Sequence, residues 1–366
     1  MDSSIKLLHA SDLHFSDTAN RLNFIDHWHQ DVFEIYKSLF PTKVSCSLFR
    51  PTSFCSTVAN GFRDFLGLIG NPQDIRCFVI TGDVATTADE RDLRAALSYL
   101  TEHPGRFESS VRPPLVRSID IFRDRTFLLP GNHDRYCAIK KTKLEVQYCK
   151  NNFNAVFKNY NYWGSDEYIF SYPIKDQAGN EVLAIIGLDC SPSDASKIKG
   201  KINRWAQGIF SNTEMADKLR EETRKYHERH IPVIWATHYL PLGNDKVKHY
   251  LPSGKYKKAV IGNHLKLHND KELLDLALEL DIRLILSGHV HKCTLHKYTN
   301  TTNMRSPSRS VTVISSGCTT CLSTDNSFNT IDLKLSGAAI EGIGLAHYRY
   351  KCEEGRFEKA WEKSGL

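Results

Sequence analysis

The sequence lacks the features of membrane, secreted and fibrous proteins. Its 366 residues contain no apolar run approaching the ~20 residues that span a bilayer. The first residues, MDSSIKLLHASD, have neither the basic nor the apolar region of a secretory signal peptide. Internal repeats, coiled-coil heptads and low-complexity linkers are not evident in it either. We therefore expect one soluble, cytoplasmic domain over residues 1–366, with no membrane partner.

The excess of one sign of charge is also small, and closely spaced cysteine pairs are few. Lys and Arg number 48 and Asp and Glu 42, and the net charge of +6 permits an anionic substrate without indicating nucleic acid. The 10 cysteines are irregularly spaced in a chain too long to need disulfides for stability, so we expect most of them to be reduced. Cys318 and Cys321 form the only C-x-x-C. They could be a redox or metal pair, but the packing of two small residues after a strand is the favoured interpretation.

Several short apolar runs in the sequence end in a carboxylate, amide or imidazole side chain. The clearest is residues 126–129, TFLL, which a Pro-Gly pair separates from Asn132, His133 and Asp134. Such a run predicts a buried strand, and Pro-Gly predicts a turn directly after it. Polar residues at the ends of strands are how α/β proteins build their sites. This stretch therefore predicts the floor of an active site.

Four other runs place further polar residues at predicted strand ends. They are residues 5–10 before Asp12 and His14, 77–81 before Asp83, 232–236 before His238, and 282–286 before His289 and His291. In extended backbone, residues two apart lie on one face, so each D-x-H or H-x-H pair is expected to present its side chains together. Taken alone, D-x-H is also explained by an Asp that caps a turn beside a solvated His. The H-x-H after a glycine is the stronger signal.

Amphipathic helices are expected between the strands, which favours an α/β fold. The helical patterns cover residues 24–40, 58–69, 87–102, 211–227 and 270–280. Two further segments are expected to be insertions, at residues 41–56 and 241–264. The second is expected to be a loop, and its lysines are explained equally by a solvated surface and by a substrate-facing element.

Other strands are predicted without a residue that suggests chemistry. Residues 168–174 and 181–188 are expected to pair antiparallel through a turn-rich link, and strands are also expected at 311–316, 328–335 and 345–352. Asp189 ends the strand at 181–188. It has no His or Asn beside it, so we expect it to be a structural cap.

Together the strand ends offer a set of oxygen and nitrogen ligands. The set is Asp12, His14, Asp83, Asn132, His238, His289 and His291. These residues suffice for two divalent ions if one carboxylate bridges them. Imidazole with carboxylate and amide oxygen suits Mn, Fe, Zn or Ni better than Ca, and the lack of cysteine ligands argues against a structural zinc site. We expect a catalytic site with positions left open to water.

The motifs D-x-H, GD, GNHD, a single His and GHVH, in this order, resemble those of the calcineurin-like metallophosphoesterase superfamily. The resemblance runs from Asp12 to His291. It implies an α/β fold in which two mixed β-sheets pack face to face with helices on the outside, a four-layer sandwich. It also implies that the strands from residue 311 onwards complete the second sheet. The implied activity is metal-dependent hydrolysis of a phosphoric ester.

The same resemblance implies a role for each site residue. One ion would be held by Asp12, His14, Asp83 and His291, and the other by Asp83, Asn132, His238 and His289. Asp83 would be the bridge, and a hydroxide bridging the two ions would be the nucleophile. His133 would be the general acid for the leaving alkoxide or a clamp on the phosphoryl group. Asp134 would orient the His133 imidazole.

Within the superfamily, the motifs are most similar to those of the class III cyclic nucleotide phosphodiesterase group. Ser-Asp-Leu-His and Gly-Asp-Val-Ala differ from the protein phosphatase motifs. Tyr239 departs from the group, which has a second His or an Asn around the single-His motif. We expect a small phosphodiester substrate, such as a cyclic nucleotide. The alternatives are a phosphomonoesterase, a DNA or RNA nuclease that uses the lysines of residues 241–264, and a metal-bearing scaffold without activity.

Overall fold

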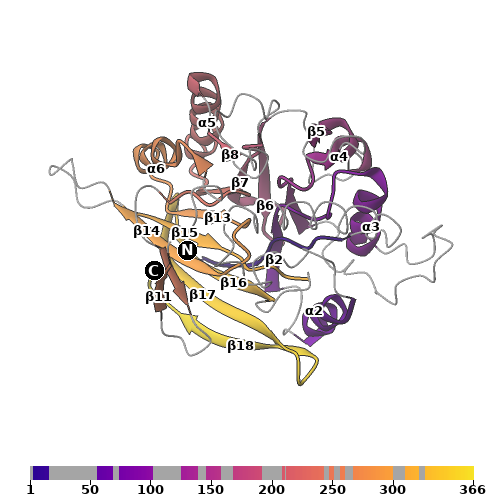
Figure 1. Ribbon diagram of the computed structural model, residues 1–366. Helices are drawn as coiled ribbons and strands as arrows, with labels where there is room; N and C mark the ends of the chain where they lie inside the picture. Colours follow the sequence, from indigo (N-terminus) through magenta and orange to yellow (C-terminus); the bar gives the residue numbers. More distant parts are fainter. Residues whose placement is uncertain are drawn as a thin grey trace.

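Two β-sheets packed face to face form the centre of the molecule, with helices on the outside (Figure 1). The computed structural model describes residues 3–15, 56–68, 74–101, 125–138, 146–157, 168–191, 208–210, 212–242, 247–250, 256–259, 267–299, 310–320 and 326–366. The helix expected at residues 24–40 lies outside these residues, as does the insertion at 41–56 except for its last residue. The α/β sandwich expected from the sequence is confirmed.

The smaller sheet has six strands in the order β18-β17-β16-β1-β2-β3. Their bounds are β1 Ser3–Ala10, β2 Ile75–Thr81, β3 Thr126–Leu129, β16 Ser327–Ser336, β17 Ala339–Lys351 and β18 Arg356–Lys363. The first three strands run parallel, because β1 pairs with β2 and β2 with β3 in that sense. β16 pairs antiparallel with the other edge of β1.

The larger sheet has eight strands in the order β11-β10-β14-β15-β13-β9-β7-β6. Their bounds are β6 Ile169–Lys175, β7 Glu181–Leu188, β9 Val233–Thr237, β10 Val247–Tyr250, β11 Tyr256–Ala259, β13 Leu284–Ser287, β14 Thr294–Thr299 and β15 Ser310–Ser315. The central strands β7, β9, β13 and β15 are parallel. The remaining strands pair antiparallel on both sides of them.

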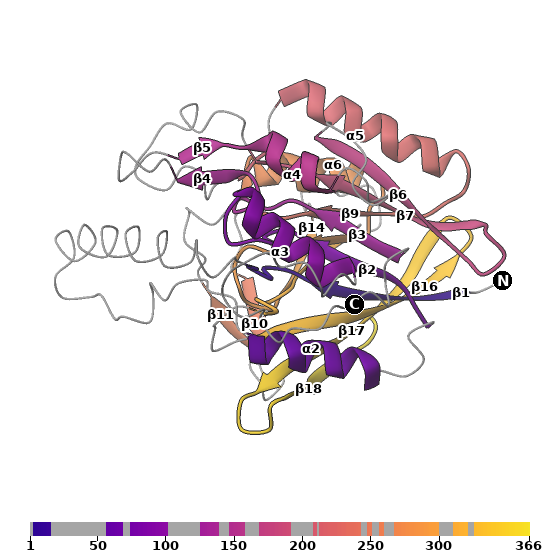
Figure 2. The same cartoon turned by 90° about the vertical axis from the view of Figure 1, so that its right-hand side faces the viewer.

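Alternating side chains of the larger sheet face two different apolar layers. Ile185 of β7 lies in the layer between the sheets, whereas its neighbour Ile186 packs in the layer that includes residues of helices α5 (Asn212–His227) and α6 (Asp270–Glu279). The helices are α2 Ser56–Leu68, α3 Glu90–Thr101, α4 Lys150–Phe157, α5 Asn212–His227 and α6 Asp270–Glu279. In Figure 2, α2 lies against β17 and β18. Of the helices in the described residues, none combines the length and apolarity that crossing a bilayer requires.

Two expectations about the strands are wrong. Of the strands expected from residue 311 onwards, only the first, β15, joins the larger sheet. β16, β17 and β18 extend the smaller one, because β16 pairs with the free edge of β1, β17 pairs with β16, and β18 pairs with β17. The segment 241–264 is not a loop throughout, since β10 and β11 lie in it as a hairpin whose first strand pairs with β14. Short ribbons, β4 (Tyr136–Ala138) with β5 (Val146–Tyr148) and β8 (Gly208–Ile209) with β12 (Leu267–His268), were not predicted.

Candidate metal centre

All seven predicted ligands lie where strands of the two sheets give way to loops, and backbone hydrogen bonds join these loops. The amide of Asp12 donates to the carbonyl of Gly82 at 3.0 Å, and the amide of His14 donates to the carbonyl of Asp83 at 3.0 Å. Across the sheets, the amide of His289 donates to Oδ2 of Asp12 at 3.0 Å. Residues far apart in the sequence are therefore fixed together by the backbone itself.

Most of these residues have left-handed backbone. Positive φ angles are found at Asp12 (55°), His14 (52°), Asp83 (53°), His289 (70°) and His291 (52°). The reason given from the sequence, two residues apart on one face of an extended strand, is therefore wrong. The side chains meet because each loop turns sharply at its ligand, a conformation that Asp and His adopt more readily than most residues.

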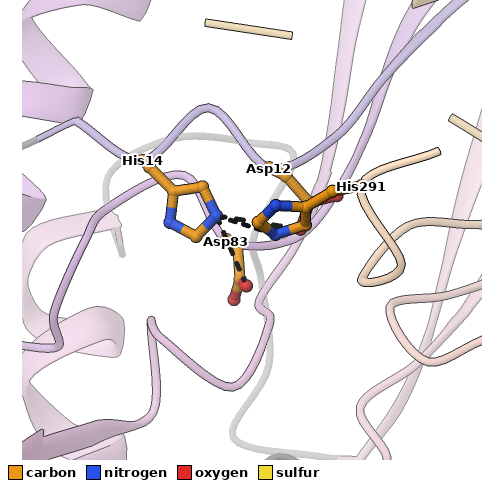
Figure 3. A group of neighbouring side chains, drawn as sticks. All are labelled: Asp12, His14, Asp83 and His291. Carbon is orange, nitrogen blue, oxygen red and sulfur yellow. Dashed lines mark hydrogen bonds and ion pairs between the residues drawn. The ribbon is translucent and has the colours of Figure 1, made fainter. Parts of the chain in front are cut away.

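The structure gathers Asp12, His14, Asp83 and His291 into what we call the first set (Figure 3). Their nearest ligand atoms all lie within 4.8 Å of one another, and three of the four residues are buried. His291 is the exception, with a side chain 27% exposed. Its Nε2 lies 3.3 Å from Nε2 of His14 and 3.3 Å from Oδ1 of Asp12. These contacts bring the predicted residues of one ion together.

The second set comprises Asp83, His238 and His289, joined by Asn132. The first three again lie within 4.8 Å of one another and are all buried. Nε2 of His238 is 3.1 Å from Oδ1 of Asn132 and 3.1 Å from Nδ1 of His289. The predicted second ligand group is thus assembled, with Asp83 common to both sets.

Two glycines provide the space that Asp83 needs. A β-carbon at Gly131 would overlap the Asp83 carboxylate. Gly82 has a φ of 98°, and a β-carbon there would lie 2.5 Å from Nδ1 of His238. The motifs GD and GNHD therefore require their glycines because backbone passes directly against the ligand side chains.

The donors of both sets fit a divalent metal ion. Ligand atoms grouped within 4.8 Å have about the spread of donors that each lie ~2.0–2.2 Å from one ion. The buried Oδ1 of Asp12 is approached by Nε2 of His291 at 3.3 Å, and within the described residues no well-aligned donor satisfies it. The close imidazole pairs, His14 with His291 and His238 with His289, can each share one proton or coordinate one cation. Nitrogen and oxygen donors of this kind suit Mn, Fe, Zn or Ni.

Burial and the Asp83 carboxylate together set the charge of the imidazoles. It holds the pKa of His14 and of His289 well below the ordinary value, so both rings are neutral, the form that binds metal. Burial opposes the charge of His238 too, but the Asp83 carboxylate outweighs it and raises the pKa of His238 to about 9. Burial alone would raise the pKa of Asp83. Electrostatic attraction from His238 first, and then from His133, outweighs burial and holds the pKa of Asp83 well below its usual range. A proton on His238 thus balances the Asp83 carboxylate, as a cation would.

His133 lies at the edge of the two sets. Its amide donates to Oδ1 of Asp83 at 2.8 Å, and its ring stands at 90° to that of His14 with centroids 4.8 Å apart. Nδ1 is 2.7 Å from the carbonyl oxygen of Thr86, to which it donates. The ring is therefore held in one orientation beside the candidate ligands, while remaining only partly buried.

Asp134 does not orient that ring, contrary to the role implied for it. Its buried carboxylate accepts hydrogen bonds from the amides of Gly131 (2.9 Å), Val84 (3.2 Å) and Ala85 (2.9 Å). These bonds join the loop after β3 to the loop after β2. Asp134 therefore shapes the backbone around Asp83, and the carbonyl of Thr86 orients His133.

Two features near the centre were not predicted from the sequence. Asp189 caps the end of β7 as expected, since its Oδ1 accepts a hydrogen bond from the amide of Ser191, but it also forms a buried ion pair with Arg135, which directly follows Asp134. Cys318, expected to be a reduced packing residue, is disulfide-bonded, and its Sγ lies 3.0 Å from the carbonyl oxygen of Asp12. A charged residue next to GNHD was the available signal for the first feature.

Of the comparisons with known proteins, a match to a family model identifies the family of the chain. No curated protein matches the sequence significantly. Among solved structures, the chain is similar to "GAP50 the anchor in the inner membrane complex of Plasmodium", at 12% identity and a TM-score of 0.44, over 99% of this chain and 88% of that one. The family model of the calcineurin-like phosphoesterases matches residues 5–293, which include every candidate ligand. The chain therefore belongs to the calcineurin-like phosphoesterase family, and is a metal-dependent hydrolase of phosphoric esters.

Proposed function

We propose that the chain is a dinuclear phosphodiesterase that hydrolyses a small diester such as a cyclic nucleotide. The observation that carries the proposal is the position of Asp83, whose Oδ2 lies 3.9 Å from Nε2 of His14 and 3.3 Å from Nε2 of His238. One carboxylate that reaches both sets can join two ions in a single centre. Two such ions supply a hydrolytic nucleophile at neutral pH and stabilise charge on the phosphoryl oxygens.

In this proposal His133 is the general acid. Because its Nδ1 is engaged by the carbonyl of Thr86, Nε2 is the atom that exchanges a proton with a bound ester. The ring lies beside His14 at the edge of the ligand sets and is partly exposed, so an ester bound at these sets can contact it. Its proton would pass to the alkoxide oxygen that leaves phosphorus.

The charge of Arg135 gives no advantage to a monoester over a diester. A phosphate monoester carries up to two negative charges at neutral pH and a diester carries one, so a monoesterase gains more from an added cation. The cationic side chain closest in sequence to GNHD is Arg135, and it is neutralised by Asp189. It therefore does not offer its charge to an ester. The cyclic nucleotide as substrate is supported by the motifs Ser-Asp-Leu-His and Gly-His-Val-His.

Hydrolysis of two chromogenic esters tests the proposal. Bis(p-nitrophenyl) phosphate and p-nitrophenyl phosphate are compared with Mn²⁺ added, using the wild-type chain, Asp83→Asn and His133→Ala. We expect turnover of the diester, loss in Asp83→Asn, and a loss of about 10²–10⁴-fold in His133→Ala, as for removal of a general acid. Asp64→Asn and His268→Ala, which change exposed residues, are the matched controls and should hydrolyse at the wild-type rate.

Each alternative has its own outcome when DNA, RNA and cyclic nucleotides are tested beside the two esters. Turnover of the monoester alone contradicts the diester preference and indicates a phosphatase. Cleavage of DNA or RNA with little activity on cyclic nucleotides indicates a nuclease. Metal binding without turnover of any of these substrates indicates a scaffold, and the proposed activity is then wrong.

A further inference from the structure

A buried ion pair lies next to the second set. Nε and Nη2 of Arg135 donate to Oδ2 of Asp189 at 2.9 and 2.6 Å. The two side chains are 0% and 1% exposed. Removing both charges from water is costly, and an apolar pair of similar size often serves packing as well or better. Packing alone therefore does not explain why an ion pair lies at this position.

The pair joins the two sheets at the second set. Arg135 follows β3 of the smaller sheet, and Asp189 follows β7 of the larger one. The amides of Arg135 and Tyr136 both donate to the carbonyl of Asn132, each at 3.1 Å. A shift of the Arg135 backbone would therefore move Asn132, whose side chain belongs to the second set. On this side Asp189 acts on a candidate ligand through Arg135.

A second series of contacts leads from Asp189, through Ser191 and Tyr239, to the two imidazoles of the second set. Its Oδ1 accepts a hydrogen bond from the amide of Ser191 at 3.0 Å, and the Ser191 hydroxyl lies 3.3 Å from the Tyr239 hydroxyl. The fully buried Tyr239 ring packs 5.2 Å from the ring of His238 and 5.0 Å from that of His289, between centroids. Tyr239 thus connects Ser191, and through it Asp189, to the rings of His238 and His289.

We propose that Asp189, together with Arg135, is a positioning residue for the second set. One series of contacts leads from Asp189 through Arg135 to Asn132, and the other leads through Ser191 and Tyr239 to His238. The two series meet where Nε2 of His238 lies 3.1 Å from Oδ1 of Asn132. Asp189 sets the spacing between ligands from the smaller sheet and ligands from the larger one. The first set has contacts of its own, among them the approach of Nε2 of His291 to Oδ1 of Asp12 at 3.3 Å. The inference rests on the proposed function in one respect, that the second set binds an ion.

Metal binding tests the inference. Asp189→Asn keeps the shape of the side chain and removes its charge. Isothermal titration with Mn²⁺, and elemental analysis of bound Mn²⁺ per chain, are made on this variant and on the wild-type chain. We expect one of two ions to bind about 10–100-fold more weakly, as for other residues that orient metal ligands, and the other ion to be unchanged. Excess Mn²⁺ should restore diester hydrolysis, because the ligands themselves remain.

A pair of matched tyrosine variants isolates the contacts around Tyr239. Tyr239→Phe loses the contact with the Ser191 hydroxyl, and Tyr226→Phe loses a similar bond of 3.0 Å to the Ser171 hydroxyl. We expect Tyr239→Phe to weaken the same ion as Asp189→Asn, by a smaller factor. Tyr226→Phe should leave the affinity of both ions and the hydrolysis rate unchanged.

The outcomes separate this inference from the proposed function. If the wild-type chain binds two ions and Asp189→Asn binds both with wild-type affinity, the positioning role is wrong and the proposed function stands. Equal weakening of both ions also contradicts the inference, since it indicates general loosening. If Asp189→Asn does not fold, Tyr239→Phe decides by the same criterion. If the wild-type chain binds no divalent ion, the proposed function fails and the positioning role fails with it.

Discussion

Most of the candidate ligand residues combine metal-binding donor atoms with a left-handed backbone conformation. A left-handed conformation costs roughly 1–2 kcal/mol at a residue with a β-carbon, and five of the seven ligands adopt it. The bonds between loops offset this cost, for example from the amide of His14 to the carbonyl of Asp83. The strain lies where the chemistry is expected, as at other functional sites.

Gly131→Ala should weaken metal binding although Gly131 is not a ligand. Its β-carbon would overlap the Asp83 carboxylate, so one of them must move. We expect bound Mn²⁺ per chain to fall below that of the wild type, with diester hydrolysis reduced about 10²-fold or more, because misplacement by ~1 Å can have that effect. Gly67→Ala, on an open face of α2, is the matched control and should stabilise the fold by about 1 kcal/mol. Normal metal content in Gly131→Ala would contradict the close approach.

His9 should make the fold sensitive to acid. Burial lowers its pKa to about 3, whereas the unfolded chain has the ordinary value of about 6.5. Below pH 6.5 the unfolded state binds a proton that the folded state refuses, so stability is full above that pH and falls as pH decreases towards 3. The loss reaches about 2 kcal/mol at pH 5. Urea unfolding of the wild type and His9→Gln at pH 8 and pH 5 checks this, since the variant should lose less stability. Equal losses would contradict it.

At the scale of elements, the sequence predicts what local pattern determines. The apolar runs before Asp12, Asp83 and Asn132 were predicted as strands, and each forms one. The pairing of strands far apart in the sequence was not predictable, because neither the residues of β1 nor those of β16 indicate that these two strands pair. The left-handed turns at the ligands were also missed, since periodicity describes extended backbone and not the points where it ends. The Arg135–Asp189 pair was missed because its members are 54 residues apart.

Helix α2 should depend on one aromatic residue for its attachment. The fully buried ring of Phe62 lies 6.2 Å from that of Phe78, 4.9 Å from that of Phe328 and 5.8 Å from that of Phe357, between centroids. Phe62→Ala leaves a cavity among these rings, and we expect the free energy of unfolding to fall by about 3–5 kcal/mol. Leu68→Ala, at an exposed site on the same helix, should change it by less than about 0.5 kcal/mol. Denaturant unfolding measures both, and similar effects would show that α2 is attached by other contacts.

At the scale of the whole molecule, a bound ion would connect the two sheets. Asp12 and Asp83 come from the smaller sheet, whereas His238 and His291 come from the larger one. An ion that binds only the folded chain adds about 2.7 kcal/mol when its free concentration is 100 times its Kd. We therefore expect a chelator to lower Tm, and Asp83→Asn to show a smaller difference between chelated and Mn²⁺-loaded samples. Identical Tm values with and without Mn²⁺ in the wild-type chain would contradict such bridging.

The place of β1 between β2 and β16 also determines when the chain can fold during synthesis. Leu7 of β1 lies opposite Ile331 of β16, so one half of its pairing waits for almost the entire chain. At ~5–20 residues per second, a ribosome takes roughly 15–65 s to pass from one residue to the other. Over that interval β1 keeps an unpaired edge, which other chains can join. Ribosome-bound chains stalled before residue 327 should leave β1 open to protease, and chains stalled well beyond β18 on an added linker should protect it.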